Sequence, residues 1–405
     1  MMRTISRLWL RLPNWASKPP NVRAASKPQT LQGLSVLLTV CFLAAAITVR
    51  AEPPPVAMPA APGATDEREF TEADQVQFAK IEAAMKKATS FMLTQQKADG
   101  SLVDHNRPTA MTALAIIAMC SVGHLPTSQT TEGEAVRKAL DYVLKPERQN
   151  AEGYFGIDGS RMYGHGIISL MLAEVVGMGV NEKQDQLVRE RLTKAVALIL
   201  WSQERKEPGH QHYGGWRYEP GSKDSDLSVS IWQLLTLRAA KNAGFTVPKK
   251  NIDAAVAYLK RSYHSKRNAA GQPLDLKSAC AYQPGHGPNF PMAAAGLLAL
   301  QICGEYAAPE VQGSANWLKE INPDINQKFF YYGIYYYAQA MYQRGGDDAE
   351  IARKKTTDIL LQNQQPDGGW EARDSQEKDA GRVYATAMAM LSLSVQYHYL
   401  PIYQR

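Results

Sequence analysis

Two carboxyl groups stand at the entrance to one strongly apolar helical segment. Asp224 and Asp226 precede the run LSVSIWQLLTLRAA, which begins at Leu227. Asp226, Ser230 and Gln233 follow helical spacing and therefore share one face of that segment. A carboxyl group in a dry, apolar environment keeps its proton more readily and can donate it to a substrate, whereas an Asp at the start of a helix can also cap free backbone N–H groups. The sequence leaves both roles open for Asp226 and Asp224.

Further polar side chains occupy the starts of other apolar helical segments. If those segments lie side by side, their first residues meet at one end and could form a polar binding site. A single histidine such as His165 is more often a buried structural residue than a catalyst, so only the group as a whole indicates a site. Its members are Tyr163, His165, His286, Arg382 and Tyr384, with His105, Arg107 and Asn289 at corresponding positions.

A tyrosine-rich run, FFYYGIYYY from Phe329 to Tyr337, adds aromatic rings to this set. Aromatic rings can stabilise a carbocation through their negative faces, and they can equally fill the seams between packed helices. Packing is the simpler role. Tyr332, Tyr335 and Tyr336 are the residues of this run that we single out as candidates for lining a central cavity.

The chain offers no sequence pattern for a metal or a nucleotide cofactor. It contains no phosphate-binding loop, dinucleotide fingerprint or GxSxG elbow, and His210 with His212 is a weak metal signal. The three cysteines beyond the N-terminal segment are Cys120, Cys280 and Cys303. An odd number favours buried thiols over a disulfide framework. We therefore expect neither a cofactor nor a metal.

The elements that must position these residues form an internal repeat. One short phrase recurs, which we call the repeat phrase: a Gln, three residues, a Gly, one residue and then a large apolar residue. Its glycines are separated by 53, 61 and 154 residues, and the last interval leaves space for two degenerate copies, so six units are expected. The clear copies begin at Gln96, Gln149, His210 and Gln364, with His in place of Gln in the third, and the runs from Ser278 and Asn322 supply the fourth and fifth units.

Each repeat phrase separates two kinds of helix. A one-sided amphipathic segment precedes it, such as the one containing Val136, Leu140 and Val143, and a segment that is apolar on nearly every face follows it, such as Met111 to Cys120. One-sided helices belong on the outside of a packed structure and wholly apolar ones inside. The pattern predicts an all-α fold of six helical hairpins in an inner and an outer layer. Periodicity alone does not decide between a closed ring and an open solenoid.

The sequence QNQQPDGGW, which ends at Trp370, resembles the QW motif of squalene-hopene cyclases, related triterpene cyclases and protein prenyltransferase β-subunits. From about Thr71 to Arg405 the chain is similar to exported bacterial proteins that carry prenyltransferase and squalene-oxidase repeats. The resemblance implies an (α/α)6 toroid around a central apolar cavity. Within it, we expect the repeated Gln, Gly and aromatic residue to clamp neighbouring hairpins together rather than to catalyse a reaction.

Cyclases of the hopene type carry their proton donor in a DxDD sequence, and the first and third of these positions are matched by Asp224 and Asp226. The resemblance therefore implies that Asp226 is the acid that protonates an isoprenoid polyene. Leu227 replaces the last Asp of the motif, and with it one of the charges that help to keep the acid protonated. The zinc site of the prenyltransferases has no counterpart, because no Asp-x-Cys occurs.

The N-terminal region has the composition of an export signal. Residues 1–33 carry basic but no acidic residues, and Leu34 to Val49 form an uncharged, mostly apolar run of 16 residues. This run is shorter than the roughly 20 residues that a membrane-spanning helix needs, so cleavage before Glu52 is favoured over an uncleaved anchor. The expected organisation is a signal peptide at 1–51, a Pro- and Ala-rich linker at 52–70 and the toroid domain at 71–405.

Charge argues against a polyanionic partner. Seven of the 45 Lys and Arg residues precede Glu52, whereas all 39 Asp and Glu residues lie at or beyond it. The exported part is therefore nearly neutral, with 38 basic residues against 39 acidic ones. We expect no nucleic-acid binding, and a location in the periplasm or cell envelope, with membrane contact through the N-terminal segment.

Two functions of different classes fit these observations. In the first, the protein is an isoprenoid cyclase or isomerase in which Asp226 protonates an apolar polyene inside the toroid. In the second, it is a non-catalytic toroid of the cell envelope that binds a lipid or a protein. Polysaccharide cleavage would require a pair of positioned carboxylates, and the sequence does not clearly show one.

Overall fold

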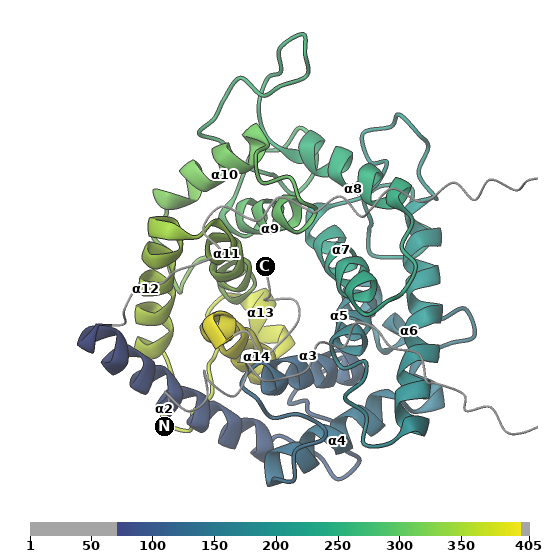
Figure 1. The fold of residues 1–405 in the computed structure, drawn as a ribbon, viewed down its shortest axis with the longest axis vertical. Helices are drawn as coiled ribbons and strands as arrows, with labels where there is room; N and C mark the ends of the chain where they lie inside the picture. Colours follow the sequence, from purple (N-terminus) through teal and green to yellow (C-terminus); the bar gives the residue numbers. More distant parts are fainter. Residues whose placement is uncertain (1–70, 398–405) are drawn as a thin grey trace, which may run out of the picture. The chain divides into compact units, whose positions relative to one another are not determined.

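A computed structural model describes residues 71–397, so the expectations for the signal peptide, for the linker and for residues 398–405 lie outside the described part. Residues 71–397 form thirteen α-helices, three short 3-10 helices and no β-strand longer than an isolated bridge. Twelve of the α-helices alternate along the chain between two concentric layers (Figure 1). None of the helices in this part is long and apolar enough to cross a membrane.

The two layers follow the predicted hairpins. The outer layer consists of α2 (Glu72–Thr94), α4 (Thr131–Val143), α6 (Glu182–Gln203), α8 (Lys249–Ser262), α10 (Pro309–Lys319) and α12 (Gly346–Gln362). The inner layer consists of α3 (Pro108–Cys120), α5 (Arg161–Glu174), α7 (Leu227–Asn242), α9 (Phe290–Ile302), α11 (Phe330–Arg344) and α14 (Arg382–Ser394). The thirteenth helix, α13 (Ser375–Ala380), precedes α14, and the 3-10 helices span Pro146–Arg148, Gly156–Asp158 and Val395–Tyr397.

The inner layer closes into a ring. Each inner helix packs against the next one in chain order, and α14 packs against α3. Every residue of α3 after Pro108 is buried, as is every residue of α9 before Ile302, whereas α4 alternates buried and exposed positions. Helices that are covered by the outer layer and by one another must be apolar on all faces. Periodicity left the choice between ring and solenoid open and the resemblance implied a closed ring, and the structure confirms the closed (α/α)6 toroid.

In the four units with a clear copy of the repeat phrase, a glutamine fastens the unit to the next one. Its side-chain nitrogen donates one hydrogen bond to the carbonyl of the phrase's own glycine and a second to a backbone carbonyl in the following outer helix. In the last unit, Gln364 reaches Ala84 in α2, which joins the end of the described ring to its beginning. The pairs are Gln96 with Gly100 and Ala135, Gln149 with Gly153 and Arg191, Gln203 with Gly214 and Asn251, and Gln364 with Gly368 and Ala84, at 2.8–3.1 Å.

The third unit corrects one expectation from the sequence. His210 stands at the Gln position by spacing, but the clamp is made by Gln203, eleven residues before Gly214 instead of four. Asn251 also donates to the Gln203 side-chain oxygen at 2.7 Å. His210 is exposed and packs against the ring of His212. An insertion between the Gln and the Gly therefore moves the histidine into a position that spacing alone mistakes for the clamp.

The repeated glycine is required by two separate constraints. All four glycines of the clear copies have φ between 91° and 94°, a region that favours glycine. In addition, a Cβ atom at any of them would lie within 2.7 Å of a carbonyl oxygen in the next outer helix. The closest approaches are 2.3 Å from Gly100 to Lys138, 2.7 Å from Gly153 to Lys194, 2.0 Å from Gly214 to Ala254 and 2.3 Å from Gly368 to Lys87.

The two candidates for the third clamp can be separated by mutation. We expect Gln203→Ala to lower the free energy of unfolding by about 2–3 kcal/mol, because it leaves two buried carbonyls and the Asn251 amide without their partner. The matched change His210→Ala removes an exposed side chain and should cost no more than about 0.5 kcal/mol. Urea denaturation of the purified variants measures both. Equal effects would contradict the assignment of Gln203 as the clamp.

Candidate functional site

The inner helices begin on one face of the ring, and a group from the following unit holds most of these starts. Gly333, near the start of α11, lies against Phe290 at the start of α9. The starts of α9 and α11 therefore lie on the same face. We call this face, defined by the first residues of the six inner helices, the inner-ring rim. Backbone N–H groups at these helix starts donate to acceptors from the following unit. Thr109 and Ala110 donate to Asp158, Met162 to the Tyr218 carbonyl, Leu227 to the Tyr282 carbonyl, Tyr331 and Tyr332 to Glu377, and Arg382 and Val383 to Asp104.

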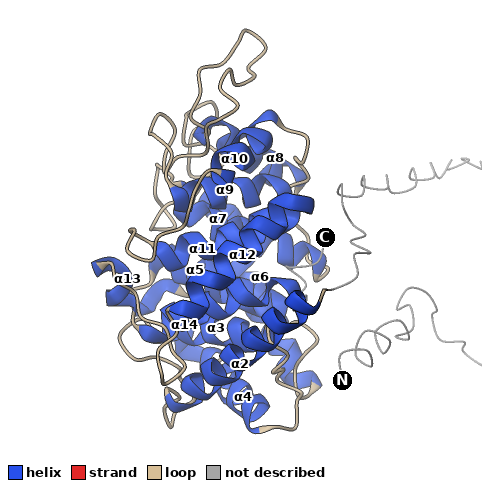
Figure 2. Ribbon diagram, turned by 90° about the vertical axis from the view of Figure 1, so that its left-hand side faces the viewer, coloured by secondary structure: helices blue, strands red, loops and turns tan. Residues whose placement is uncertain are grey.

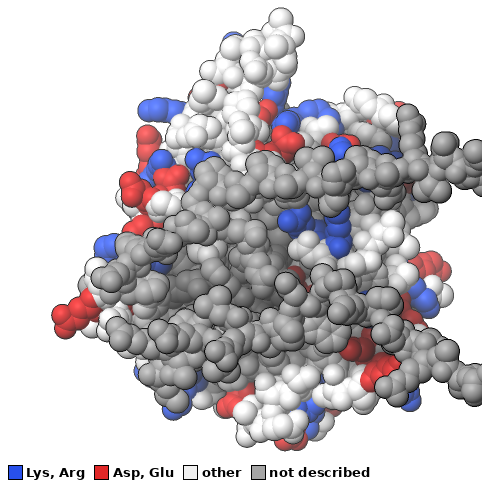
Figure 3. Space-filling model, viewed as in Figure 1, with Lys and Arg blue, Asp and Glu red and all other residues white. Residues whose placement is uncertain are grey.

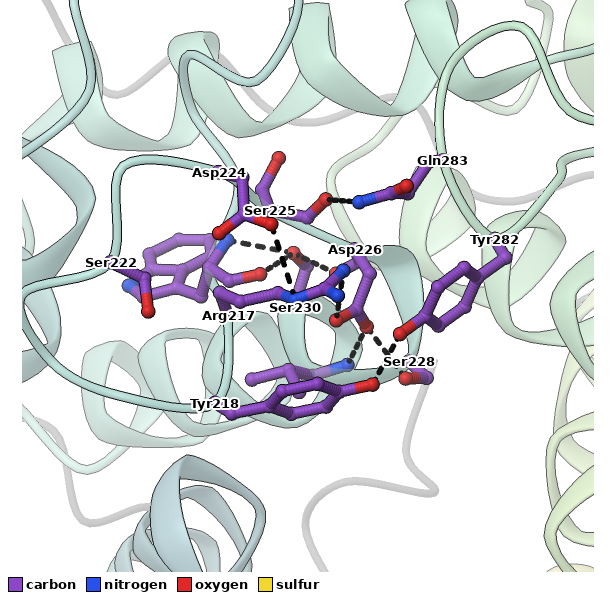
Figure 4. Close-up of polar contacts among 12 residues, drawn as sticks. Arg217, Tyr218, Ser222, Asp224, Ser225, Asp226, Ser228, Ser230, Tyr282 and Gln283 are labelled. Carbon is purple, nitrogen blue, oxygen red and sulfur yellow. Dashed lines mark hydrogen bonds and ion pairs between the residues drawn. The ribbon is translucent and has the colours of Figure 1, made fainter.

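Asp226 is fully buried at the start of α7 and caps that helix. One carboxylate oxygen accepts the Val229 N–H at 2.9 Å and the Ser228 hydroxyl at 2.6 Å, and the other lies 3.2 Å from Nη1 of Arg217 (Figure 4). Burial raises the pKa of Asp226 and outweighs these hydrogen bonds and the Arg217 charge, which lower it. The capping role that the sequence left open for Asp226 is therefore present in the structure.

Arg217 links the two carboxylates that the sequence singled out. Its Nε lies 3.4 Å from a carboxylate oxygen of Asp224, which is about half exposed. The guanidinium lies over the ring of Tyr218 at 4.5 Å and over that of Tyr282 at 5.6 Å, and the two tyrosine hydroxyls are hydrogen-bonded to each other (Figure 4). An arginine between two aromatic faces and two carboxylates is held in one orientation.

Two tyrosines from other units reach the same place. The Ser228 hydroxyl donates its hydrogen bond to Asp226, so it accepts the hydrogen bond from the Tyr163 hydroxyl of α5. The Tyr332 hydroxyl of α11 donates to the Ser228 carbonyl at 2.8 Å. Burial raises the pKa of Tyr163 and Tyr332 far above the ordinary value, so both stay protonated donors. The ring thus brings predicted residues of α5, α7 and α11 together.

A second buried carboxyl group lies at the rim and was not singled out from the sequence. Glu377 of α13 accepts the N–H groups of Tyr331 and Tyr332 at 3.1 and 2.8 Å and the Tyr384 hydroxyl at 3.1 Å. Burial raises the pKa of Glu377 to about 7, against the effect of these donors. Its sequence context, SQEKDA, gives no signal of burial. Arg217, Tyr218 and Tyr282 were missed for a similar reason, since only the fold brings their loops beside Asp226.

Two predicted site residues bind the repeat phrase of their own unit, at its large apolar residue. Ser230 accepts the backbone N–H of Trp216 at 2.8 Å, and His165 accepts that of Phe155 through Nδ1 at 3.3 Å. Thr112 and Thr386 do the same in the first and last units. The other His165 nitrogen donates to the Ala195 carbonyl, and burial lowers the pKa of His165 to about 4, so its ring is neutral.

The remaining predicted residues lie apart from Asp226 in their contacts. Gln233 donates to the Met162 carbonyl at 2.8 Å and so joins α7 to α5. Tyr335 stacks on Trp232 with ring centroids 5.9 Å apart, which is the packing role expected for part of the tyrosine run. Tyr336 is fully buried and packs edge-on against the same Trp232 ring. His286 is exposed in a loop beside Tyr282, and Arg382 is paired with Asp367 at 2.7 Å and lies over Phe91.

Comparison with known proteins supports the fold. No protein-family model matches the sequence, and no curated protein matches it. Among solved structures, the GH76A α-1,6-mannanase of Salegentibacter sp. HEL1_6 aligns with a TM-score of 0.54 and 10% identity over 78% of this chain and 99% of the mannanase. The type II terpene cyclase MstE of Scytonema aligns with a TM-score of 0.49 and 15% identity over 78% of this chain and 97% of the cyclase. The mannanase similarity shows a shared α/α-toroid fold and no more.

The buried, neutral ring of His165 predicts how the stability of the protein depends on pH. Because burial lowers its pKa from 6.5 to about 4, the folded protein resists a proton that the unfolded chain accepts, so stability falls as the pH drops below 6.5. Between pH 7.5 and 5, the wild type should lose about 2 kcal/mol more stability than His165→Thr. Threonine retains an acceptor for the Phe155 N–H, as in the first and last units. Denaturant unfolding at both pH values measures the difference, and parallel pH profiles would refute a buried neutral ring.

Proposed function

We propose that the protein is a non-catalytic toroid that binds an isoprenoid-type lipid at the inner-ring rim. The pairing of Asp226 with Arg217 supports this proposal most directly. One oxygen of Asp226 accepts from two donors and the other faces a guanidinium at 3.2 Å, and these contacts favour the ionised carboxylate against the effect of burial, which raises its pKa. An ionised carboxylate has no proton to give to an alkene. It serves instead to hold Arg217 and the surrounding tyrosines in place.

Aromatic surface at the rim supplies the contacts for such a ligand. Tyr163, Tyr218 and Tyr282 are partly exposed there and are fixed by hydrogen bonds between their hydroxyls and neighbouring groups. Rings held in one orientation offer apolar faces at little entropic cost to binding. The resemblance of the repeat phrase to the QW motif is the reason for choosing an isoprenoid among apolar ligands.

Acid-catalysed isomerisation of an isoprenoid is the second candidate. Burial raises the pKa of Asp226, which is the direction that a proton donor needs. Asp226 also occupies the position that the DxDD resemblance assigns to the acid. In this alternative, Arg217 would have to move away from the carboxylate before the reaction.

A single experiment separates the two candidates. The full-length protein, Asp226→Asn and the control Asp224→Asn are purified, incubated with squalene and with a lipid extract of the host, and analysed by mass spectrometry. Asparagine still caps α7, so the variant keeps the helix start while it loses the acid. We expect all three proteins to retain the same lipid within about twofold and to form no product, because binding by aromatic faces does not require an acid.

Other outcomes decide against the proposal. A product formed by the wild type and by Asp224→Asn, but lost in Asp226→Asn, would establish acid catalysis. Retention of no lipid by any of the three folded proteins would reject the lipid-binding function altogether.

We further propose that the protein is exported and has no nucleic-acid partner, with membrane contact through its N-terminal segment until that segment is cleaved. On the face shown in Figure 3, acidic and basic side chains are interspersed around the ring, which fits the near balance of charge beyond Glu52. N-terminal sequencing of the protein from host cells tests export. We expect the mature chain to begin at Glu52, because the apolar run before it is too short to span a bilayer. A cytosolic chain that begins at Met1 would contradict export.

A further inference from the structure

The short helix α13 is fastened to the rim by one side chain. Glu377 is the only residue of α13 that is buried, and the rest of its sequence, SQEKDA, is polar apart from Ala380. A helix of six residues is not stable without tertiary contacts. Figure 2 shows α13 projecting on one side of the ring, apart from the two layers. Its docking therefore depends on the contacts of Glu377 and not on an apolar anchor.

The other contacts of α13 are longer and exposed. Asp374, which caps α13, accepts the Phe329 N–H at 3.3 Å. Asp379 faces the segment before α3, where its carboxylate lies 3.5 Å from Arg107 and its carbonyl 3.3 Å from the His105 ring. Exposed pairs of this length contribute little stability. By contrast, Glu377 accepts three hydrogen bonds of 2.8–3.1 Å from α11 and α14.

The place at which Glu377 docks belongs to the proposed lipid site. Tyr332 donates its backbone N–H to Glu377 and its hydroxyl to Ser228, beside Asp226. Tyr384 donates its hydroxyl to the same Glu377 oxygen as Tyr332. We propose that α13 is a lid on the inner-ring rim, latched while the Glu377 carboxyl is protonated and loosened when it ionises. The gating role rests on the proposed function, whereas the latch itself does not.

The groups around Glu377 give the sign of the effect. Burial and the negative charge of Asp374 favour the neutral carboxyl, and the donors on α11 and α14 favour the ionised one. The charge of Arg373 lowers the pKa of the adjacent Tyr331 and that of Glu371 raises it. Arg107 and His105 face Asp379. Burial prevails and raises the pKa of the docked Glu377 from 4.5 to about 7. Docking is therefore strongest below pH 4.5, weakens as the pH rises to about 7 and changes little above that.

Hydrogen exchange of the full-length protein without lipid tests the latch. Exchange of peptides covering residues 373–380 is followed by mass spectrometry from pH 5 to pH 8 and corrected for the intrinsic rate at each pH. We expect protection in the wild type to fall by about 10- to 100-fold over this range. Glu377→Gln removes the titrating group and should show no such fall. Glu371→Gln, an exposed control two residues before this segment, should behave like the wild type.

A second variant tests the direction of the effect. Tyr384→Phe removes a donor that favours the ionised carboxyl, so the midpoint of the fall should move to higher pH. An unchanged protection in the wild type, or an equal fall in Glu377→Gln, would overturn the latch, as would exchange at the intrinsic rate at every pH. Lipid retention is measured separately by mass spectrometry. A protein that binds no lipid but shows the pH-dependent protection would refute the lipid site and leave the latch standing.

Discussion

Most units of this ring are completed by the unit that follows them. In four of the six units, a glutamine at the end of an outer helix, or just beyond it, donates to a carbonyl of the next outer helix, and the next unit also caps most of the inner helices. Backbone groups at helix ends are costly to bury without partners. A single hairpin could not satisfy its own ends, so the ring is the arrangement in which these ends find partners. The buried inner layer and the shared rim both follow from this dependence.

The same dependence explains how the candidate site is built. Asp226 belongs to the third unit, but Tyr163 comes from the second and Tyr332 from the fifth. None of these side chains could form a site within its own hairpin. Closing the ring places the starts of the inner helices together, and their polar first residues then meet around a carboxylate. The residues that cap helices and the residues that surround the proposed ligand site are therefore partly the same.

Much of the fold could be predicted from the sequence, because the apolar patterning of each helix reports its layer directly. The spacing of Gly100, Gly153 and Gly368 revealed the repeat, since each glycine is fixed by backbone conformation and by close contact. The third clamp was assigned wrongly to His210, because an insertion preserves the bonding of Gln203 and not its spacing. A spacing pattern identifies only residues that recur at a constant interval. It misses a repeated contact when an insertion changes the number of residues between the two partners.

The site was less predictable than the fold. Asp226 could be singled out by its type and its place before a helix, yet its pKa depends on its burial and on Arg217, which no local pattern links to it. Glu377 is indistinguishable from a surface glutamate until α13 docks. The pKa values of such groups are set by burial and by neighbours from other units. A single sequence therefore identifies the groups that can titrate, but it does not identify the ones whose pKa is shifted.

The bond from Gln364 to Ala84 has a mechanical meaning. An open solenoid has two terminal repeats that can fray, since each of them lacks one neighbour. In the described ring, every unit has a neighbour on both sides, so there is no weakest end from which unfolding can start. Opening the ring at four of its six seams breaks a glutamine bond of the same kind. Closure therefore ties the stability of the first and last units to each other, as it does for neighbouring units elsewhere in the ring.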